Sequence, residues 1–492
     1  MEDRFSSFEV KPEMNAAQLT LRRSVPAKAE SAAPSEPRQQ WKVVHLLPAL
    51  ALWALLWAGY NTGPWYVESP YFPISWVDLI HGLRAFFPIL GGWIAALIIL
   101  MRTRHIAHWI MGPLGLVLVF TVAGLASSAT MSPEPVEALY WGATYGAIVI
   151  VLVAICTFDD PLPHLSSLLT LNWMIAGLFT LGILGIVPHL GVTDAFEVQT
   201  GKSWVIKEIA GMPGTRNTGF ARYAAMCALG ALGNIGEGSR TVRLFWAGLL
   251  GIGLYCLVIA NGRTEILAFI GGALLILGVR KKYRLFFVLV ASALGILLGL
   301  KGFYQTLFHY LTRTGHVDAT ITGRTDTWRA GWALFLRSPW WGFGFQADRY
   351  MGVGHMHNAF LHVLVEGGIL GGAAIYLALI IVWWLTIKHF FLRPPQKESL
   401  LPPEIPGVLM FLTLSSIPES TFAYFSAAWL LSAPALAYVV ALDRKLAGEA
   451  KTKQANSTQV WLESLRRRRA RGLSTGEPAI APGPDGGSVT IH

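Results

Sequence analysis

The feature that most constrains this chain is a series of long apolar runs separated by polar connections. A helix needs roughly 20 apolar residues to cross the hydrocarbon core of a bilayer, and runs near that length recur from residue 43 to residue 442. Only 14% of the 492 residues are charged, well below the roughly 25% typical of soluble domains. The sequence therefore predicts an all-α integral membrane protein.

By this length rule we predict about twelve transmembrane helices. The predicted spans are Val43–Tyr60, Ala85–Met101, Ile106–Ser127, Ala138–Phe158, Ser166–Leu190, Thr218–Ile235, Leu244–Ala260, Ile266–Gly278, Leu285–Leu300, Asn358–Ile387, Gly407–Ile417 and Phe422–Leu442. An error in the short 266–278 or 407–417 run would reverse the orientation of every later span.

Lysine and arginine lie mainly in every second connection between the predicted spans, and connections rich in these residues stay in the cytoplasm. The connections of this set contain Arg102 and Arg104, Arg240 and Arg243, Arg280 to Arg284, Lys388 to Lys397, and Arg444 and Lys445. One connection of the same set is acidic instead and contains Asp159 and Asp160. This pattern predicts that both termini are cytoplasmic. It also predicts that the long connections face outward, including a large outer loop at 301–357.

Two polar tails flank the predicted membrane domain, 43–442. Residues 1–42 and 443–492 have too few apolar residues to offset the cost of ordering, so we predict disordered cytoplasmic tails. The second tail is Gly/Pro-rich near its end and contains an arginine cluster at 466–471, which suits anionic membrane lipid. The net charge of +10 lies mainly in connections and tails, so membrane orientation explains it and nucleic-acid binding is not predicted.

Within the outer loop, the segment from Asp326 to Arg337 has the periodicity of an amphipathic helix. Trp328, Trp332 and Phe335 recur at helical spacing, and tryptophan is favoured at the membrane–water boundary. We expect a short helix that lies along the outer boundary of the membrane.

Several arginines on the predicted outer side are unexpected for a positive-inside orientation. They are Arg216, Arg222, Arg263 and Arg324. A single arginine of this kind is readily explained by an ion pair with a carboxylate such as Glu265 or Asp326. A set of them indicates an anionic ligand near the headgroups, and the planar guanidinium suits a phosphate or diphosphate.

Three histidines lie close together in the sequence at 355, 357 and 362. No cysteine or clustered carboxylate completes a metal site, so we predict no metal ion. His357, next to Asn358 at the mouth of a predicted span, is a candidate proton acceptor; its alternative role is to cap that helix. Glu366, about two turns into the span, is expected to pair with an outer arginine or to line the cavity. The glycines that follow it suit close helix packing.

These motifs resemble a known family. The pattern GR…W…GFGF…HNAFLHVLVEGGILGG, preceded by RTE and RNTGFARYAA at the start of earlier spans, is similar to the O-antigen ligase and O-antigen polymerase superfamily of bacterial inner membranes. The resemblance covers residues 214–372 in detail. It implies a membrane glycosyltransferase that takes a glycan from a polyprenyl diphosphate carrier at the periplasmic face. Ligases pass the glycan to lipid A-core, and polymerases pass it to a carrier-linked repeat unit.

The resemblance also implies roles for individual residues. Arg216 or Arg222 would hold the donor diphosphate together with Arg263 and Arg324, and His357 would activate the acceptor hydroxyl. Asn358, Glu265 and Glu366 would support them. No cofactor is expected, the sequence has no Asp-x-Asp motif, and direct attack by the acceptor would invert the anomeric centre without a metal.

Three alternatives remain open at this level. The same donor chemistry serves a ligase and a polymerase of O-antigen or exopolysaccharide. A polyprenyl-dependent transferase of another type would need a carboxylate base in the first outer loop, where Asp78 is available. A flippase or transporter of lipid-linked glycan would also bind diphosphate, but its charges are expected near mid-membrane and its spans in repeats.

Overall fold

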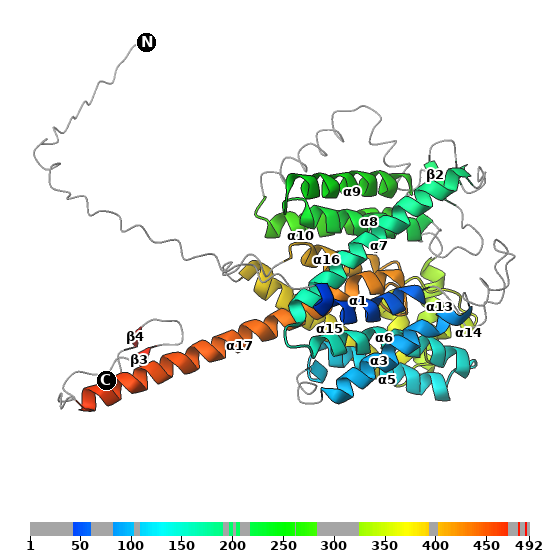
Figure 1. Ribbon diagram of the computed structural model, residues 1–492. Helices are drawn as coiled ribbons and strands as arrows, with labels where there is room; N and C mark the ends of the chain where they lie inside the picture. Colours follow the sequence, from blue (N-terminus) through cyan, green and yellow to red (C-terminus); the bar gives the residue numbers. More distant parts are fainter. Residues whose placement is uncertain are drawn as a thin grey trace, which may run out of the picture. The chain divides into compact units, whose positions relative to one another are not determined.

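Helices make up nearly all of the described part of the chain (Figure 1). The computed structural model describes residues 43–60, 82–102, 109–189, 196–199, 203–206, 217–260, 262–282, 324–392, 402–470, 481–482 and 488–489. The chain divides into two units, Met1–His45 and Leu46–His492, and every contact and site discussed below belongs to the second. The predicted all-α membrane fold is confirmed.

The described helices lie between residues 43 and 470. Their bounds are α1 Val43–Ala58, η1 Arg84–Phe86, α3 Phe87–Met101, α5 Pro113–Thr130, α6 Pro135–Cys156, α7 Pro161–His189, α8 Asn217–Asn234, α9 Arg240–Ile259, α10 Arg263–Val279, α13 Arg324–Arg337, α14 Ala347–Tyr350, α15 Ala359–Ile387, η3 Lys388–Leu392, α16 Glu404–Ser415 and α17 Ala427–Ala470. Two short antiparallel hairpins complete the described elements: β1 Phe196–Gln199 with β2 Ser203–Ile206, and β3 Ala481–Pro482 with β4 Ser488–Val489.

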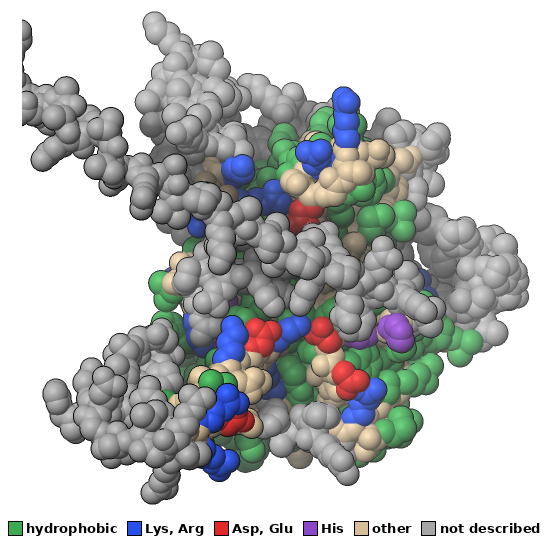
Figure 2. All heavy atoms as spheres, turned by 60° about the vertical axis from the view of Figure 1, so that its left-hand side comes forward, with side chains coloured by type: hydrophobic (Ala, Val, Ile, Leu, Met, Phe, Trp, Pro, Cys, Tyr) green, Lys and Arg blue, Asp and Glu red, His purple; other side chains and the backbone are tan. Residues whose placement is uncertain are grey.

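Seven of the described helices are long and apolar enough to cross a membrane, and α1 and α16 add shorter apolar helices. Many large hydrophobic side chains lie on the surface, as Figure 2 shows in green, which is expected where lipid is the solvent. The predicted span 285–300 falls outside the described residues. The count of about twelve spans therefore stays a prediction.

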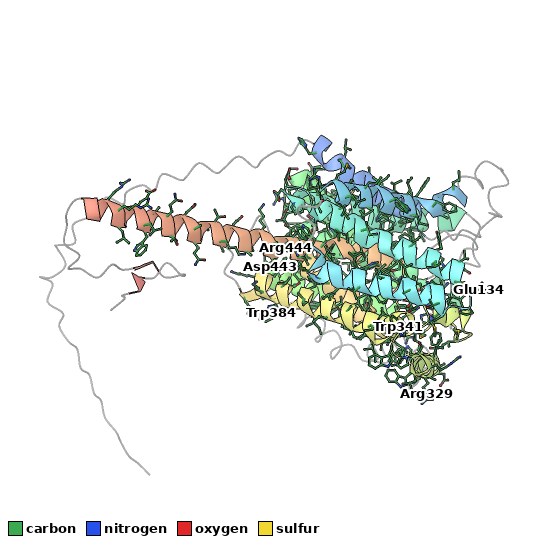
Figure 3. The ribbon with its side chains drawn as sticks, turned by 90° about the horizontal axis from the view of Figure 1, so that it is seen from below. Glu134, Arg329, Trp341, Trp384, Asp443 and Arg444 are labelled. Carbon is green, nitrogen blue, oxygen red and sulfur yellow. The ribbon has the colours of Figure 1, made fainter. Side chains whose placement is uncertain are left out.

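The bundle has two distinct ends (Figure 3). Asp443 and Arg444 lie at one end, and Glu134 and Arg329 lie at the other. Helix α13 lies at the Arg329 end. It confirms the amphipathic helix predicted at 326–337, with Leu334 and Phe335 buried and Trp332 exposed.

The prediction of a disordered tail from residue 443 is wrong for residues 443–470, because α17 continues to Ala470. Its residues from 450 to 460 are exposed, so packing is not what holds them helical. This part is rich in Ala, Lys, Glu, Gln and Arg, which favour helix, and a helix that has already formed is extended without a new nucleation cost. The predicted tail at 1–42 lies outside the described residues.

The loop between α13 and α15 is inserted between α5 and α6. The Phe345 ring lies 5.6 Å from Phe120 and 5.5 Å from Tyr145, measured between centroids. Gly124 and Gly142 make room for it, because a Cβ at either would come within 2.6 Å of that ring. This packing fixes the loop that leads into the candidate site.

The same loop docks on a break in α15. The break is at Gly368, whose φ is 61°. The loop supplies hydrogen bonds there, since Phe343 N donates to Val365 O at 2.8 Å and Ile369 N donates to Pro339 O at 2.7 Å. Gly367 and Gly371 pack against Phe120, as predicted for close helix contacts. Gly368 instead permits the break.

We expect Gly368→Ala to destabilise the protein by about 2–4 kcal/mol. The added Cβ would lie 2.2 Å from Trp340 O, and the positive φ disfavours any side chain. Gly448→Ala is the control, because that glycine lies within α17 with open space around it. Thermal unfolding of the purified variants in detergent measures both changes. An unchanged midpoint for Gly368→Ala would contradict the role assigned to the break.

Candidate active site

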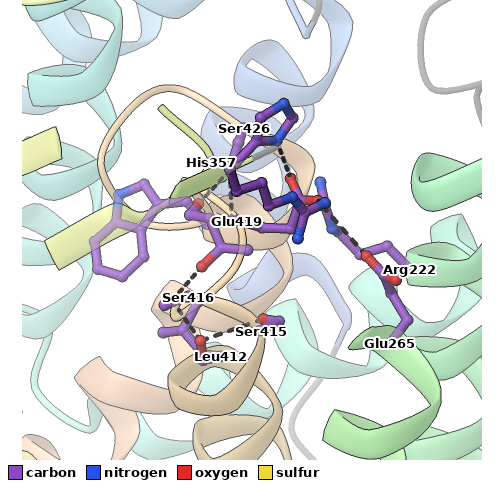
Figure 4. Close-up of polar contacts among 11 residues, drawn as sticks. Arg222, Glu265, His357, Leu412, Ser415, Ser416, Glu419 and Ser426 are labelled. Carbon is purple, nitrogen blue, oxygen red and sulfur yellow. Dashed lines mark hydrogen bonds and ion pairs between the residues drawn. The ribbon is translucent and has the colours of Figure 1, made fainter. Parts of the chain in front are cut away.

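Five separate segments bring charged and titratable side chains together at the Arg329 end of the bundle (Figure 4). Arg222 lies on α8 and Glu265 in the first turn of α10, with Nη2 and Oε1 3.7 Å apart. Arg324, the first residue of α13, places Nη2 2.8 Å from Oε1 of Glu419. His357 Nδ1 lies 3.2 Å from the other oxygen, Oε2, of Glu419. Glu419 therefore joins an arginine and a histidine that are far from it in sequence.

Backbone contacts explain why Glu419 meets His357. Ala359 N, at the start of α15, donates to Ser416 O at 2.9 Å and to Glu419 O at 3.1 Å. Asn358 is the residue that caps α15, because its side-chain oxygen accepts from Leu361 N at 2.8 Å. His357 therefore does not cap α15, which was the alternative role predicted for it. Its φ of 50° is unusual for a residue other than glycine, and such strain is often found at functional sites.

The carboxyl of Glu419 is held ionised. Burial alone would raise its pKa, but the hydrogen bond with His357 and the positive charges of Arg222 and Arg324 outweigh burial, so the pKa lies below its ordinary value. An ionised carboxylate can only accept hydrogen bonds. His357 Nδ1 must therefore be the donor to Glu419. In the neutral imidazole, this tautomer leaves the lone pair of Nε2 for a substrate proton.

This lowered pKa makes a testable prediction for stability. A carboxyl whose pKa is lower in the folded protein stabilises the fold fully above its unfolded pKa, about 4.3 for Glu, and this contribution is lost as pH falls through the folded value. We expect wild type to exceed Glu419→Gln in stability by about 1–3 kcal/mol near neutral pH, with the difference shrinking below about pH 4. Thermal unfolding across this range measures it. Glu463→Gln, on the exposed part of α17, is the control, and a difference independent of pH would contradict the assignment.

Arg222 is not saturated by its carboxylate. Its side chain is 12% exposed and that of Glu265 is 1% exposed, yet the 3.7 Å separation is longer than a hydrogen bond. Arg222 Nε and both Glu265 oxygens are buried without a hydrogen-bond partner among the described residues. An unsatisfied buried donor is costly, and a bound anion would satisfy Arg222 Nε.

A second buried cluster lies beside the first. His362 Nε2 is 3.2 Å from Asp348 Oδ1 and 3.2 Å from Glu366 Oε1, and Glu366 Oε1 also accepts from Gln346 N at 2.9 Å. The expectation that Glu366 pairs with an outer arginine is therefore wrong: its partners within the described segments are a histidine and the docked loop. This cluster ties α14 and the loop to α15.

His355 connects the two clusters. Its ring centroid lies 4.4 Å from that of His357, and its Nδ1 is 3.6 Å from Asp348 Oδ2. Burial lowers the pKa of His355, although Asp348 acts in the opposite direction. Burial would raise the pKa of Asp348, but His362 and His355 outweigh it and hold that pKa well below its usual range. His355 is thus favoured as a neutral neighbour of His357.

The structure corrects one premise about metal binding. Carboxylates do accompany the histidines, in the groups Asp348, His355 and His362, and His355, His357 and Glu419. They were missed because Asp348 and Glu419 come from other segments. In the second group, Glu419 already balances Arg324, and Arg222 also acts on it. A divalent cation there would face two guanidiniums, which opposes binding.

The remaining predicted residues divide as follows. Arg263 is the first residue of α10, half-buried and two positions before Glu265, whereas Arg216 lies outside the described residues. Glu265 forms an ion pair with Arg222, which is the structural explanation that the sequence allowed for a single outer arginine. Asp326 pairs with Arg329 rather than with Arg324.

Sequence reasoning missed Glu419, although a signal was present. It is the only charged residue between Ile405 and Leu442, and a lone carboxylate between apolar runs of a membrane protein is a candidate functional group. Asp348 carried no comparable signal, because charged residues surround it in an outer loop.

Comparison with known proteins supports the motif assignment. The family model described as O-antigen ligase matches residues 248–376. That range contains Glu265, Arg324 and His357, whereas Arg222 and Glu419 lie outside it. The exopolysaccharide production protein ExoQ of Rhizobium meliloti (strain 1021) is 26% identical over 206 residues. That alignment covers 36% of this chain and 46% of ExoQ, so the chain matches about half of its relative's length.

Proposed function

Because the chain belongs to the O-antigen ligase and O-antigen polymerase superfamily, we propose that it transfers a glycan from a polyprenyl diphosphate carrier to an acceptor hydroxyl at the periplasmic face of the bacterial inner membrane. The observation that carries this proposal is the convergence of Arg222, Arg324 and His357 around Glu419. It combines anion-binding donors with an oriented base at one end of a membrane bundle.

The reaction breaks the bond between the anomeric carbon and the diphosphate oxygen. His357 Nε2 accepts the proton of the acceptor hydroxyl, whose oxygen attacks the anomeric carbon from the side opposite the diphosphate. Polyprenyl diphosphate leaves with the bonding electrons, and the anomeric centre is inverted. Guanidiniums of Arg222, Arg263 and Arg324 stabilise the charge that develops on this leaving group, which is electrostatic catalysis without a metal.

The carboxylates have separate roles in this mechanism. Glu419 orients His357 and fixes its tautomer. Glu265 holds Arg222 at the start of α10, and Glu366 supports the docked loop. None of these three is required to contact the substrate.

We assign the acceptor as lipid A-core, the ligase type of reaction. A second candidate is polymerisation of an exopolysaccharide, which is favoured by the name of the relative ExoQ. Both reactions use the same donor chemistry, so the products in the cell distinguish them.

A deletion strain tests the assignment. Loss of ligase activity should leave carrier-linked polymer in the membrane and lipid A-core without glycan. Single repeat units on lipid A-core, or loss of secreted polysaccharide alone, would replace the ligase with a polymerase. Unchanged surface and secreted glycans would contradict the proposed function as a whole.

A further inference from the structure

A cavity of about 760 Å³ lies at the end of the bundle opposite the candidate active site. It is formed where α6 ends, α7 begins and α17 passes, and Trp109, Arg444 and Lys451 are among its lining residues. Arg444 follows the first residue of α17 by 17 positions, which places it about 26 Å along the helix axis. The cavity is therefore separate from the glycan-transfer site (Figure 3).

Arg444 is held in place, and one of its hydrogen-bond donors is not used. Its guanidinium carbon lies 4.0 Å from the centroid of the Trp109 ring, a stacked arrangement that fixes the donor fork. A Cβ added to Gly112 would come within 3.0 Å of Nη2, so the glycine leaves room for the guanidinium. Nη1 is buried and finds no hydrogen-bond partner in the described part of the chain. A fixed guanidinium with an unused donor suits an anion.

The nearby carboxylates have basic partners of their own. Asp160 lies 3.4 Å from Lys445 Nζ, Asp159 lies 4.0 Å from Arg102 Nη1, and Asp443 lies 2.7 Å from both Lys388 Nζ and His389 Nε2.

Asp443 also acts on Arg444 through its charge. Even so, Arg444 and the exposed Lys451 add positive charge to the cavity beyond these pairs. The local excess is therefore cationic.

The surface beside the cavity is apolar. Ile110 and Met111, next to Trp109 in the sequence, are 48% and 87% exposed. Figure 2, which brings this end of the bundle forward, shows Lys and Arg side chains next to Asp and Glu over a hydrophobic surface. A ligand with an anionic head and apolar chains matches this combination better than a soluble anion does.

We propose that this cavity binds the phosphate group of an anionic phospholipid. The phosphate oxygens accept hydrogen bonds from Arg444 Nη1 and Lys451 Nζ, and the acyl chains lie along the apolar surface near Met111. The same phosphate chemistry is offered by soluble phosphate, which the test separates from lipid. This site does not depend on the proposed glycosyltransferase activity.

The test uses the full-length protein in neutral detergent, with native mass spectrometry counting bound molecules and thermal unfolding as a second readout. Phosphatidylglycerol should bind and raise the unfolding temperature, whereas phosphatidylcholine and inorganic phosphate should not. We expect Arg444→Gln to weaken phosphatidylglycerol binding about tenfold, with a smaller loss for Lys451→Gln. Lys453→Gln is the matched control, because it lies on the same exposed stretch of α17 and does not line the cavity.

Lys451→Gln keeps the test decisive if Arg444→Gln fails to fold, because Lys451 is exposed. Equal binding of phosphatidylcholine would overturn the proposal, as would Arg444→Gln and Lys451→Gln binding like Lys453→Gln. A shift with inorganic phosphate equal to that with lipid would overturn the lipid assignment.

Discussion

Replacing His357 with alanine is expected to reduce glycan transfer by about 10²–10⁴-fold while the donor still binds. The reason is the geometry at Nδ1, which lies 3.2 Å from an ionised Glu419 and so leaves Nε2 as the proton acceptor. Single-turnover transfer from a polyprenyl-diphosphate-linked glycan measures the rate. Donor binding to the same purified variant is measured in parallel.

Asn358→Ala provides the comparison for this variant. Asn358 caps α15, so Asn358→Ala should lower the free energy of unfolding by about 1 kcal/mol. Its transfer rate should fall far less than that of His357→Ala. A full transfer rate in His357→Ala would reduce His357 to a structural residue. Loss of donor binding together with turnover would instead place it in the diphosphate site.

Arg324→Ala is expected to lower the transfer rate by about 10²–10³-fold. Arg324 would lose its contact with the leaving diphosphate, and Glu419 would lose its 2.8 Å ion pair. Arg324→Lys keeps the charge but not the planar fork, so an intermediate rate is expected. Steady-state assays over a range of donor concentrations measure these effects on kcat and KM.

The control for this prediction lies on the same helix. Arg329 pairs with Asp326, and its side chain is 79% exposed, so Arg329→Ala should transfer glycan at the wild-type rate. Equal losses in the Arg324 and Arg329 variants would point to general damage to α13. A wild-type rate in Arg324→Ala would remove Arg324 from the diphosphate site.

Much of the fold could be predicted from local pattern. Apolar runs identify the helices, because burial in lipid requires long apolar segments, and the spacing of Trp328, Trp332 and Phe335 identified α13. The break at Gly368 could not be read in this way. It depends on a loop from residues 339–344 that supplies hydrogen bonds to the broken helix, and such tertiary contacts leave no periodic signal.

The candidate site was only half visible in the sequence. The sequence identified Arg222, Arg324 and His357 as candidates, because polar and charged side chains next to membrane spans often have a function. Glu419, which joins two of them, lies 95 residues after Arg324, and no rule of spacing connects such distant positions. Ion pairing is also decided in space, which is why Glu366 has His362 as its partner rather than an arginine.

The most direct test of the central claim follows the bond between the glycan and the carrier diphosphate. Purified protein reconstituted in liposomes is given a polyprenyl-diphosphate-linked glycan and lipid A-core in the presence of EDTA, and both products are analysed. The mechanism predicts free polyprenyl diphosphate and glycan joined to the acceptor with inverted anomeric configuration, and much slower formation of both products by His357→Ala. Donor that crosses the bilayer intact, or transfer that requires an added divalent metal, would contradict it.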